Sequence, residues 1–493
     1  MIYGSAYDLI HRLDRLPGIL DPTVGRWRAW PAVRMQLLWT LLYQAAGVSS
    51  SSLDRIIRRS GRLRAALRPI PMPAGGGPGR VVFLAAARTY RDPDGCMRET
   101  NFGDLVSGKT VRLPTVLVHY PWPGGGANRS LVPDALDATR PLLMADAIAL
   151  LLHLDPDIRR AADTLALRIA AVSDAIPVRR LRRMCRLALA VFEARRRVFR
   201  RLFARLGARA IVTTYAPGRM GEIAAARELG LPVLEVQHGM IGRYCSDYHW
   251  PAEYSDTRDG LPLADRIVAF GPLFADFLTS SGFWKKDQVT VTGCGAIDRF
   301  RAAAAPNVRP AEQGVRMLFM TQIGGRAFAV PLLRRFIASA GAEARDLRLD
   351  IKVHPEEQGR AGDYWDLAAT APWVRVLPAD RTPFEAMNRS DMVISYASLS
   401  LVEALGLGIP AVSLHDGARP GFGQEFGVEN EIADAVVHVG DAADLLALAR
   451  RLADPAAAAA WRARARAAGE QFFAGGFVDK TASLIDALTE RAS

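Results

Sequence analysis

Two histidines in this chain each follow a short segment that reads as a strand. His354 follows the run Leu349–Val353 and precedes Pro355, which turns the chain away from the strand direction. His238 follows the run Leu231–Gln237. Imidazole titrates near neutral pH, so a histidine at the carboxyl edge of a sheet could bind a phosphate or take a proton from a hydroxyl group. A histidine at a strand end is also a common structural turn, so each needs chemical partners nearby.

A hydroxyl-rich turn lies about 40 residues after His354. The predicted strand Met392–Ser395 is followed by Ser398 and Ser400, where the next helix begins. Serine oxygens cap the free N–H groups of a helix start, and the partial positive charge there attracts phosphate. Glu403 falls one turn later, within reach of a polar ligand. We therefore expect these residues and the His354 turn to bind a nucleotide at the carboxyl ends of parallel strands.

A third segment of the same half, Thr321–Arg326, has glycines where a strand would pass into a helix. Gly324 would let backbone N–H groups approach a ligand closely, and Arg326 could neutralise a diphosphate. An ordinary turn between a strand and a helix explains the segment equally well.

The sequence Gln237-His238-Gly239 predicts a second reactive site in the first half of the chain. His238 suits the role of general base for a hydroxyl acceptor. The loop that follows contains side chains able to hydrogen-bond or stack on sugars, among them Tyr248 and His249. We expect these groups to contact the acceptor or the donor sugar.

Two further charged residues, Arg88 and Glu222, are candidates for substrate contact. Arg88 could face an anionic substrate or be surface charge, and Glu222 could contact the acceptor or be a carboxylate on a helix face. Asp92-Pro-Asp94 and Asp155-Pro-Asp157 have the Asp-x-Asp form that metal-using transferases employ. The first reads as a turn and the second as a helix cap with proline at the first helical position. We therefore predict no metal site.

The elements that must position these residues alternate between strands and helices in two series. A chain of 493 residues, half of them hydrophobic, should form more than one domain. The fold class expected is α/β, with two doubly wound Rossmann-like domains facing a cleft. The predicted units are a helical N-terminal segment at 1–70, an acceptor domain at 80–305, a nucleotide-sugar-binding domain at 315–475 and a C-terminal helix at 476–493.

The net charge of +12 is concentrated in one arginine-rich segment, Pro177–Gly207. Its arginines interleave with apolar residues, which is typical of a basic amphipathic helix or helix pair. Three interpretations remain open: a solvated face on a helix packed against the core, contact with anionic lipid headgroups, and nucleic-acid binding. No recognised DNA or RNA motif accompanies the charge, so no nucleic-acid partner is expected.

The remaining composition favours an intracellular protein. The apolar runs at 37–42 and 142–154 are too short or too interrupted to span a bilayer, and the N-terminus does not resemble a signal peptide. The four cysteines show no zinc spacing and suit a reducing cytosol. We expect a cytoplasmic protein that associates peripherally with the inner face of the plasma membrane through its arginine-rich helices.

The order and spacing of these motifs resemble those of GT-B glycosyltransferases of bacterial capsule and surface-polysaccharide synthesis. The nearest likeness is to the enzymes that use CMP-activated acidic sugars, the polysialyltransferases and capsular Kdo transferases. The CDP-glycerol phosphotransferases are more distant. The motifs concerned are His354-Pro355, Ser398 with Ser400, and Gln237-His238-Gly239. The acidic base motif of the bacterial sialyltransferases is not evident in the first half, which sets this chain apart from them.

The resemblance implies that the His354 and Ser398 groups bind the donor nucleotide's phosphate while the first domain binds the acceptor. The activity expected is metal-independent transfer of a sugar from a nucleotide-sugar to a growing glycan or glycolipid. No cofactor is expected, because the nucleotide-sugar is itself a substrate. A glycerophosphotransferase, a sugar-nucleotide epimerase and a non-catalytic scaffold of a polysaccharide assembly complex are the alternatives.

Overall fold

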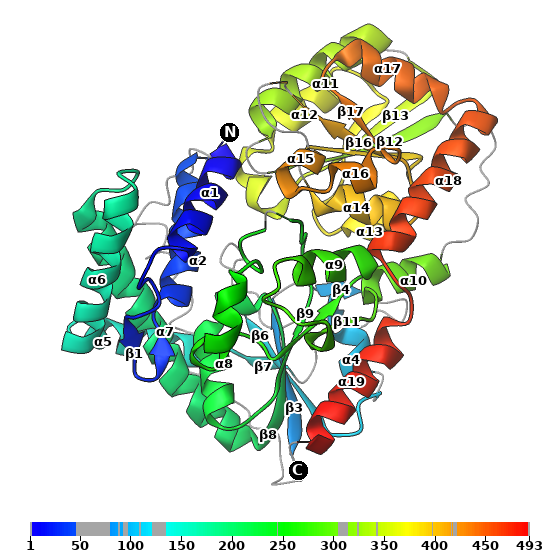
Figure 1. Cartoon of the computed structure of the whole chain (residues 1–493). Coiled ribbons are helices and arrows are strands. Elements are labelled where there is room, and N and C mark those ends of the chain that lie inside the picture. Colours follow the sequence, from blue (N-terminus) through cyan, green and yellow to red (C-terminus); the bar gives the residue numbers. More distant parts are fainter. Residues whose placement is uncertain are drawn as a thin grey trace.

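Two α/β units lie one above the other in the protein, with helices around each sheet (Figure 1). The computed structural model describes residues 2–45, 79–86, 89–91, 97–107, 110–120, 135–243, 245–303, 314–322, 325–341, 344–396, 398–415, 417 and 422–491. The predicted sites Arg88 and Gly324 lie outside the described residues.

The first unit is built on a seven-stranded sheet with the order β11-β10-β9-β8-β3-β6-β7, in which every neighbouring pair is parallel. Val81, Phe83 and Ile211 are fully buried, as expected for a parallel sheet covered on both faces. The strands are β3 (Arg80–Ala86), β6 (Thr115–Tyr120), β7 (Leu136–Asp137), β8 (Ala208–Thr214), β9 (Val233–Val236), β10 (Arg266–Ala269) and β11 (Val289–Val291).

Helices cover both faces of this sheet, and a small antiparallel pair lies beside it. The long helix α7 packs on α5, α6 and α8. The elements are β4 (Thr89–Arg91), β5 (Met97–Glu99), α4 (Gly103–Ser107), α5 (Thr139–Leu152), α6 (Pro156–Val172), α7 (Val178–Leu206), η1 (Ala216–Gly218), α8 (Met220–Glu228), η2 (Ala252–Gly260), α9 (Pro272–Ser280), η3 (Lys286–Gln288) and α10 (Gly295–Ala303).

The N-terminal segment packs against the first unit through α7. Its described residues, 2–45, form two helices separated by a short antiparallel hairpin, and the rest of the predicted helical segment, 46–70, lies outside the described residues. Gly25 takes a φ of +58° in this hairpin, a left-handed conformation that tight turns need and glycine adopts without strain. The elements are α1 (Ile2–Asp14), β1 (Thr23–Val24), β2 (Trp27–Arg28) and α2 (Trp30–Ala45).

The second unit is built on a six-stranded sheet with the order β14-β13-β12-β15-β16-β17, again parallel throughout. The strand order reverses direction at β12, which lies between β13 and β15. Ligands of open α/β sheets bind at such a switch point. The strands are β12 (Val315–Met320), β13 (Leu347–Lys352), β14 (Val374–Val376), β15 (Met392–Ser395), β16 (Ala411–Leu414) and β17 (Val436–Val439).

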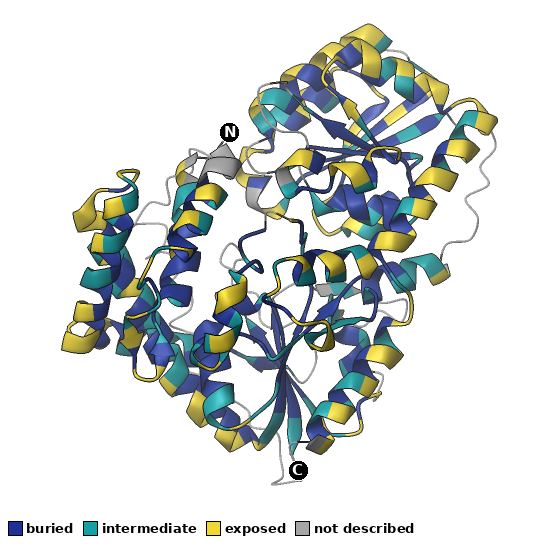
Figure 2. Cartoon of the chain, in the orientation of Figure 1, coloured by how far each residue is buried: buried dark blue, intermediate teal, exposed yellow. Residues whose placement is uncertain are grey.

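The helices of the second unit alternate with these strands, and Figure 2 shows both sheets buried between helices whose outer faces are exposed. The elements are α11 (Arg326–Ala340), η5 (Pro355–Arg360), α12 (Gly362–Ala369), α13 (Pro383–Met387), α14 (Leu399–Gly406), α15 (Phe422–Phe426), α16 (Glu429–Ile432), α17 (Ala442–Arg451), α18 (Pro455–Phe472) and α19 (Phe477–Arg491).

The end of the chain returns to the first unit. Helix α18 packs on α14 of the second unit and on α9 of the first. A Cβ atom on Gly271 would lie 2.3 Å from the backbone of Phe472, so only glycine fits this crossing. Helix α19 then buries Phe477 and Ile485 in the same core as Val81 of the first sheet. The two units are therefore joined by packed helices as well as by the connection between α10 and β12.

No helix in the part of the chain that the structure describes combines the length and the hydropathy needed to cross a bilayer.

Candidate functional site

The three predicted ligand-binding turns of the second unit lie side by side. The Thr321 amide, after β12, donates to the Lys352 carbonyl at 3.1 Å, and its Oγ1 accepts from the His354 amide at 2.8 Å. On the other side of β12, Ser395 Oγ donates to the Met320 carbonyl at 2.9 Å. These bonds tie the carboxyl ends of β13, β12 and β15 together. His354 therefore lies at the same sheet edge as the serine turn.

Ser398 caps helix α14 as the sequence predicts. Its Oγ accepts from the Ser400 amide at 3.2 Å and lies 2.7 Å from the Ser400 hydroxyl oxygen. A Cβ atom on Gly325 would come within 3.4 Å of the Tyr396 Cβ atom, so the turn after β12 touches the turn after β15. The start of α14, with its two hydroxyl groups, directly follows the turn after β15, and such a helix end suits an anionic ligand.

Arg326 and Glu403 each lie close to a residue that is not part of the predicted phosphate site. Arg326 begins α11 and pairs with Asp363 of α12, with Nη1 and Oδ2 at 2.6 Å. Glu403 lies on α14 close to Cys294 of the first unit. Burial raises the pKa of the Cys294 thiol to about 12, and the charge of Glu403 adds to the increase. Glu403 is therefore near the junction of the two units, and ligand roles for both residues remain predictions.

His238 lies at the carboxyl edge of the first sheet, in contact with a strained tyrosine. Its ring packs edge-on against Tyr215 with centroids 5.0 Å apart. Tyr215 follows β8 and has a φ of +51°, the only positive φ of a non-glycine residue in the described ranges. Such backbone strain persists only where the surroundings enforce it, and it is concentrated at functional sites. The Tyr215 hydroxyl accepts from Trp39 Nε1 of α2 at 2.6 Å, so the N-terminal segment supports the His238 contact.

Gln237 holds the His238 turn in place from inside the protein. The side chain is fully buried, its Nε2 donates to the Gly239 carbonyl at 2.9 Å, and its Oε1 accepts from the Phe270 amide at 2.8 Å. The nitrogen and the oxygen of the side-chain amide are thus both hydrogen-bonded within the protein. Gln237 positions the loop, and its predicted contact with a substrate remains untested.

Tyr248 and His249 are buried where the loop after His238 meets the N-terminal helices. Tyr248 donates from its hydroxyl to Glu235 Oε1 at 2.8 Å, and burial raises the pKa of Glu235 to about 7. His249 is 7% exposed, and burial lowers its pKa to about 4. Its carbonyl accepts from Arg34 Nη2 at 2.8 Å. In this arrangement both residues connect the loop to the core, and their sugar contacts remain a prediction.

A buried group of polar residues lies at the same edge of the first sheet. Of its members, the sequence indicated only Glu222. Arg219 is 7% exposed and donates to Thr213 Oγ1 at 2.9 Å and to the Leu84 carbonyl. Its guanidinium carbon lies 4.2 Å from the centroid of the Tyr120 ring. The Tyr120 hydroxyl donates to Glu222 Oε1 at 3.1 Å.

Two carboxylates and a second arginine complete this group. Arg195 of α7 lies 3.5 Å from Glu222 Oε1, while Glu222 Oε2 has no hydrogen-bond partner among the described residues. Burial raises the pKa of Glu99 to about 7, although backbone amides bond to it. The signal in the sequence was the pair Arg219 and Glu222 three residues apart at a helix start, next to the Pro217-Gly218 turn.

The loop after His238 also contacts the second unit. A Cβ atom on Gly242 would lie 2.0 Å from the Phe426 carbonyl oxygen, so the backbones touch there. Arg243 donates to the Gly427 carbonyl and pairs with Glu431 at 2.5 Å. This chain segment reaches up to α15 and α16 in Figure 1. The His238 turn of the first unit is thus followed, within a few residues, by residues that touch the second unit.

In the described ranges, no group of three or more histidine, cysteine, aspartate or glutamate side chains could hold a metal ion.

Comparison with known proteins gives the fold. No family model and no curated protein matches the chain. Among solved structures, a putative UDP-N-acetylglucosamine 2-epimerase from Listeria monocytogenes superposes with a TM-score of 0.50 at 12% identity, covering 85% of this chain and 98% of that one. The S. aureus protein MnaA with UDP gives 0.49 at 14%, over 82% and 94% of the two chains. Acinetobacter baumannii MurG gives 0.43 at 14%, over 83% and 100%.

The fold predicted from the sequence is confirmed: the chain has the GT-B fold, with two Rossmann-like domains and an additional N-terminal helical segment. At these identities the likeness establishes the fold alone.

Proposed function

We propose that the protein is a glycosyltransferase that moves a sugar from a nucleotide-sugar to a glycan or glycolipid acceptor of the cell surface. The observation that carries the proposal is the cluster at the switch point of the second sheet. There the His354 amide donates to Thr321 Oγ1, Ser395 Oγ at the end of β15 donates to the Met320 carbonyl, and Ser398 caps helix α14 directly after β15. The solved structures of similar fold include proteins bound to UDP and to UDP-GlcNAc, which supports a sugar nucleotide as the ligand.

The donor side is suited to stabilise a departing phosphate. When the bond between the sugar's anomeric carbon and the phosphate oxygen breaks, negative charge develops on the nucleotide. The N-terminus of α14, the hydroxyl groups of Ser398 and Ser400, and the imidazole of His354 would offer hydrogen bonds to that charge. The resemblance to enzymes that use CMP donors extends the proposal to an acidic sugar.

The acceptor side would be the His238 turn. The acceptor hydroxyl oxygen forms the new bond to the anomeric carbon, its proton passes to the imidazole of His238, and the nucleotide leaves with the electrons of the broken bond. Tyr215 packs against that imidazole, and Gln237 holds the turn that carries it. The Arg243 contact with the second domain would bring acceptor and donor together.

A sugar-nucleotide epimerase is the second candidate, because the structure with the TM-score of 0.50 is a putative UDP-GlcNAc 2-epimerase. A CDP-glycerol-type phosphotransferase is a more distant alternative. A glycosyltransferase and an epimerase differ in the molecule that carries the sugar after the reaction. A transferase releases one nucleotide for each sugar that becomes linked to an acceptor, whereas an epimerase leaves the sugar on its nucleotide.

The experiment is a product analysis with radiolabelled CMP-, UDP- and GDP-sugars, purified protein and a glycolipid extract. Sugar in the glycolipid fraction, matched by free nucleotide, is the expected result. His238→Ala should lower turnover with saturating donor by about 10²–10⁴-fold, the usual effect of losing a general base. His153→Ala, on the turn after α5, is the matched control. Label that stays on the nucleotide as a new epimer would overturn the proposal, and unchanged turnover in His238→Ala would overturn the role of His238.

A further inference from the structure

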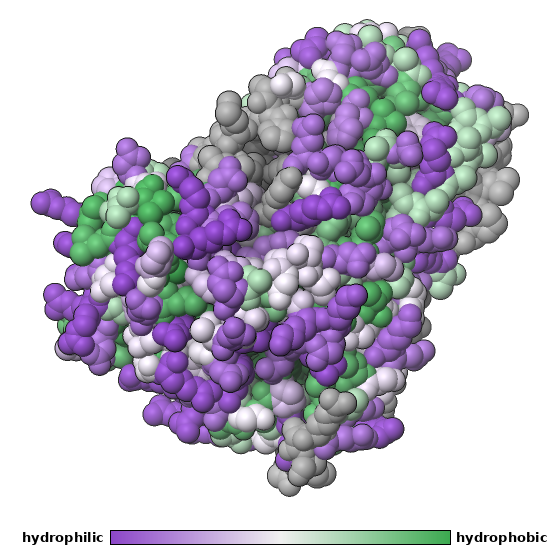
Figure 3. Space-filling view, viewed as in Figure 1, coloured by the Kyte–Doolittle hydropathy of each residue, from purple (hydrophilic) through white to green (hydrophobic). Residues whose placement is uncertain are grey.

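The three-helix unit α5–α7 exposes most of the large apolar side chains on the described surface. Nine large hydrophobic residues are exposed in the described ranges, and seven of them belong to this unit. They are Met144, Leu150, Leu151, Leu154, Leu167, Val178 and Leu187. Figure 3 shows hydrophobic side chains gathered at the surface over α6, with strongly hydrophilic ones around them. Isolated exposed leucines are ordinary, but such a concentration on one unit indicates an interaction surface.

The most exposed of these residues lie together where α5 meets α6. Leu150, Leu151 and Leu154 are 69%, 75% and 68% exposed. Met144 precedes Leu151 by two helical turns and therefore shares its face of α5. The opposite face of α5 is buried against α7 and includes Ala145 and Ala149. Helix α5 is thus apolar on both faces, but only one face has a partner in the described structure.

The same unit contains most of the excess positive charge of the chain. Residues 139–206 include fifteen arginines and six acidic residues, a net charge of +9 in a chain of +12. A surface that is both apolar and cationic complements an anionic lipid bilayer, where leucines enter the acyl region and arginines meet the headgroups. The same charge opposes pairing with a second copy of the chain.

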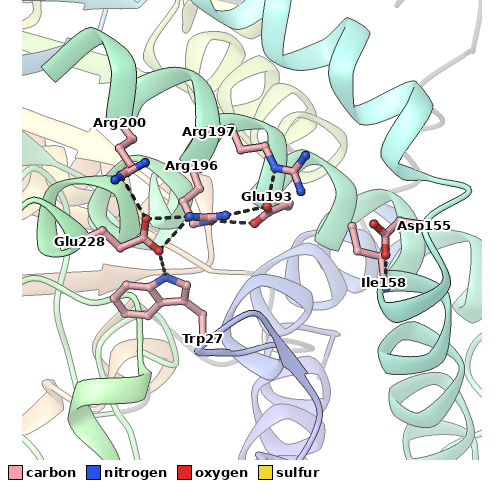
Figure 4. Close-up of polar contacts among 8 residues, drawn as sticks. All are labelled: Trp27, Asp155, Ile158, Glu193, Arg196, Arg197, Arg200 and Glu228. Carbon is pink, nitrogen blue, oxygen red and sulfur yellow. Dashed lines mark hydrogen bonds and ion pairs between the residues drawn. The ribbon is translucent and has the colours of Figure 1, made fainter. Parts of the chain in front are cut away.

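The structure separates two groups of arginines on α7. In the first group, Arg196 and Arg197 pair with Glu193, and Arg196 and Arg200 approach Glu228, which also accepts from Trp27 (Figure 4). Arg182 and Arg186 pair with Asp163 of α6, and Arg195 approaches Glu222. These arginines hold the helices together, as the first of the three interpretations expects.

The second group has no ion pair with any described residue and is exposed. Its members are Arg179, Arg180, Arg183, Arg201 and Arg205. They extend along α7 on the same unit as the leucines. We propose that the leucines at the α5–α6 joint and these five arginines form a docking surface for an anionic membrane. The first domain would thereby be held at the lipid surface, independently of what the protein transfers.

The test is flotation of the whole protein with vesicles of phosphatidylcholine alone or with about one-third phosphatidylglycerol, at low and at physiological salt. The wild-type protein should float with the anionic vesicles and remain unbound with the neutral ones. The triple change Leu150→Ser, Leu151→Ser and Leu154→Ser should lower the partition coefficient about tenfold or more, because it removes three apolar insertions. Arg179→Gln with Arg180→Gln should lower it by about tenfold at low salt and by less at high salt.

Matched controls come from the second domain. Arg334 and Arg335 are also adjacent, exposed and without an ion pair to a described residue, so Arg334→Gln with Arg335→Gln should float like the wild type. Trp365→Ser removes an exposed apolar side chain, 56% exposed, outside the proposed surface. Circular dichroism confirms that each variant is folded.

Three outcomes would overturn the proposal: no binding of wild type to anionic vesicles, equal loss in the control pair, or unchanged binding of the leucine variant. The last outcome, combined with recovery of an acidic protein or of RNA by the same face, would assign the surface to that partner instead.

Discussion

His238 and His354 end strands in different domains, and their surroundings determine what each can do. His354 is fixed through its backbone amide to Thr321 Oγ1, at the sheet edge where the serine turn of α14 also lies. His238 is fixed through its neighbours, with Tyr215 against the ring and Gln237 beneath the turn. A binding role therefore suits His354, and a proton-transfer role suits His238.

Changing Gln237 to alanine should destabilise the protein and disturb the His238 turn. The change leaves the Phe270 amide and the Gly239 carbonyl without their buried partner, which costs about 2 kcal/mol or more. Urea unfolding measures the loss. Gln36→Ala, at an exposed position of α2, is the control and should be nearly neutral. Equal stability of the two variants would show that Gln237 does not hold the turn.

The buried His249 should make stability depend on pH in the acidic range. Burial lowers its pKa to about 4, whereas an unfolded histidine titrates near 6.5. Its contribution is complete above about pH 6.5. As the pH falls toward 4, the unfolded state takes up a proton that the folded state does not, so the free energy of unfolding falls.

His249→Gln removes this proton uptake without removing a polar side chain. The stability advantage of the wild type over the variant should therefore shrink by up to about 3 kcal/mol between pH 6.5 and 4. The carboxyl groups of Glu235 and Asp247, whose pKa values burial raises, act in the opposite sense but are common to both proteins. Urea unfolding at pH 4.5, 5.5 and 7 measures the difference, and a difference independent of pH contradicts the assignment.

A buried ion pair joins helices α1 and α2, and its arginine also bonds to the first domain. Arg34 and Asp14 are 0% and 1% exposed and lie 2.7 Å apart, and Arg34 also donates to the carbonyls of Ser246 and His249. Trp30 donates to the same Asp14 carboxylate. The N-terminal segment is thus connected to the loop that carries His238.

Changing Arg34 and Asp14 together should be less harmful than the sum of the two single changes. Arg34→Met leaves the Asp14 carboxylate buried without its cation, which costs about 3–5 kcal/mol. Adding Asp14→Leu removes that charge, so the double variant should be less destabilised than the two single variants together. Unfolding free energies of the four proteins give the coupling, and strictly additive losses would contradict it.

Several strands could be predicted from the sequence because they are short segments rich in apolar residues and bounded by turn residues. The predicted strand Met392–Ser395 was placed correctly to the residue. The serine cap of α14 was also predicted, because an N-cap depends on residues two positions apart. Such local signals are sufficient for elements and for turns at strand ends.

The contacts that hold the site residues in place could not be predicted, because they join residues far apart in the chain. Trp39 and Tyr215 are separated by 176 residues, and Tyr120 and Glu222 by 102. The sequence shows Tyr248 as a possible sugar contact, but only the fold shows that Glu235 accepts from its hydroxyl. The antiparallel hairpin β1–β2 was missed for a different reason, since two-residue strands have no periodic pattern.

At the scale of the whole molecule, the two domains meet where Gly242 touches Phe426. Gly242→Ala would place a Cβ atom 2.0 Å from the Phe426 carbonyl oxygen, so the domains must separate or strain by about 1–3 kcal/mol. Gly239→Ala, in the same loop, meets nothing within 4 Å and is the matched control. Small-angle scattering should show a larger radius of gyration for Gly242→Ala only. An unchanged radius with unchanged stability would contradict the domain contact.

The most direct test of the donor site is calorimetric titration of the protein with CMP, UDP and GDP. We expect one of these nucleotides to bind with 1:1 stoichiometry. Ser398→Ala with Ser400→Ala should weaken that binding at least about tenfold, the effect of losing one charge-assisted hydrogen bond. Ser280→Ala, at an exposed position of α9, should bind like the wild type. If none of the three nucleotides binds, or if the double serine variant keeps the wild-type affinity, the second domain does not hold a nucleotide as described.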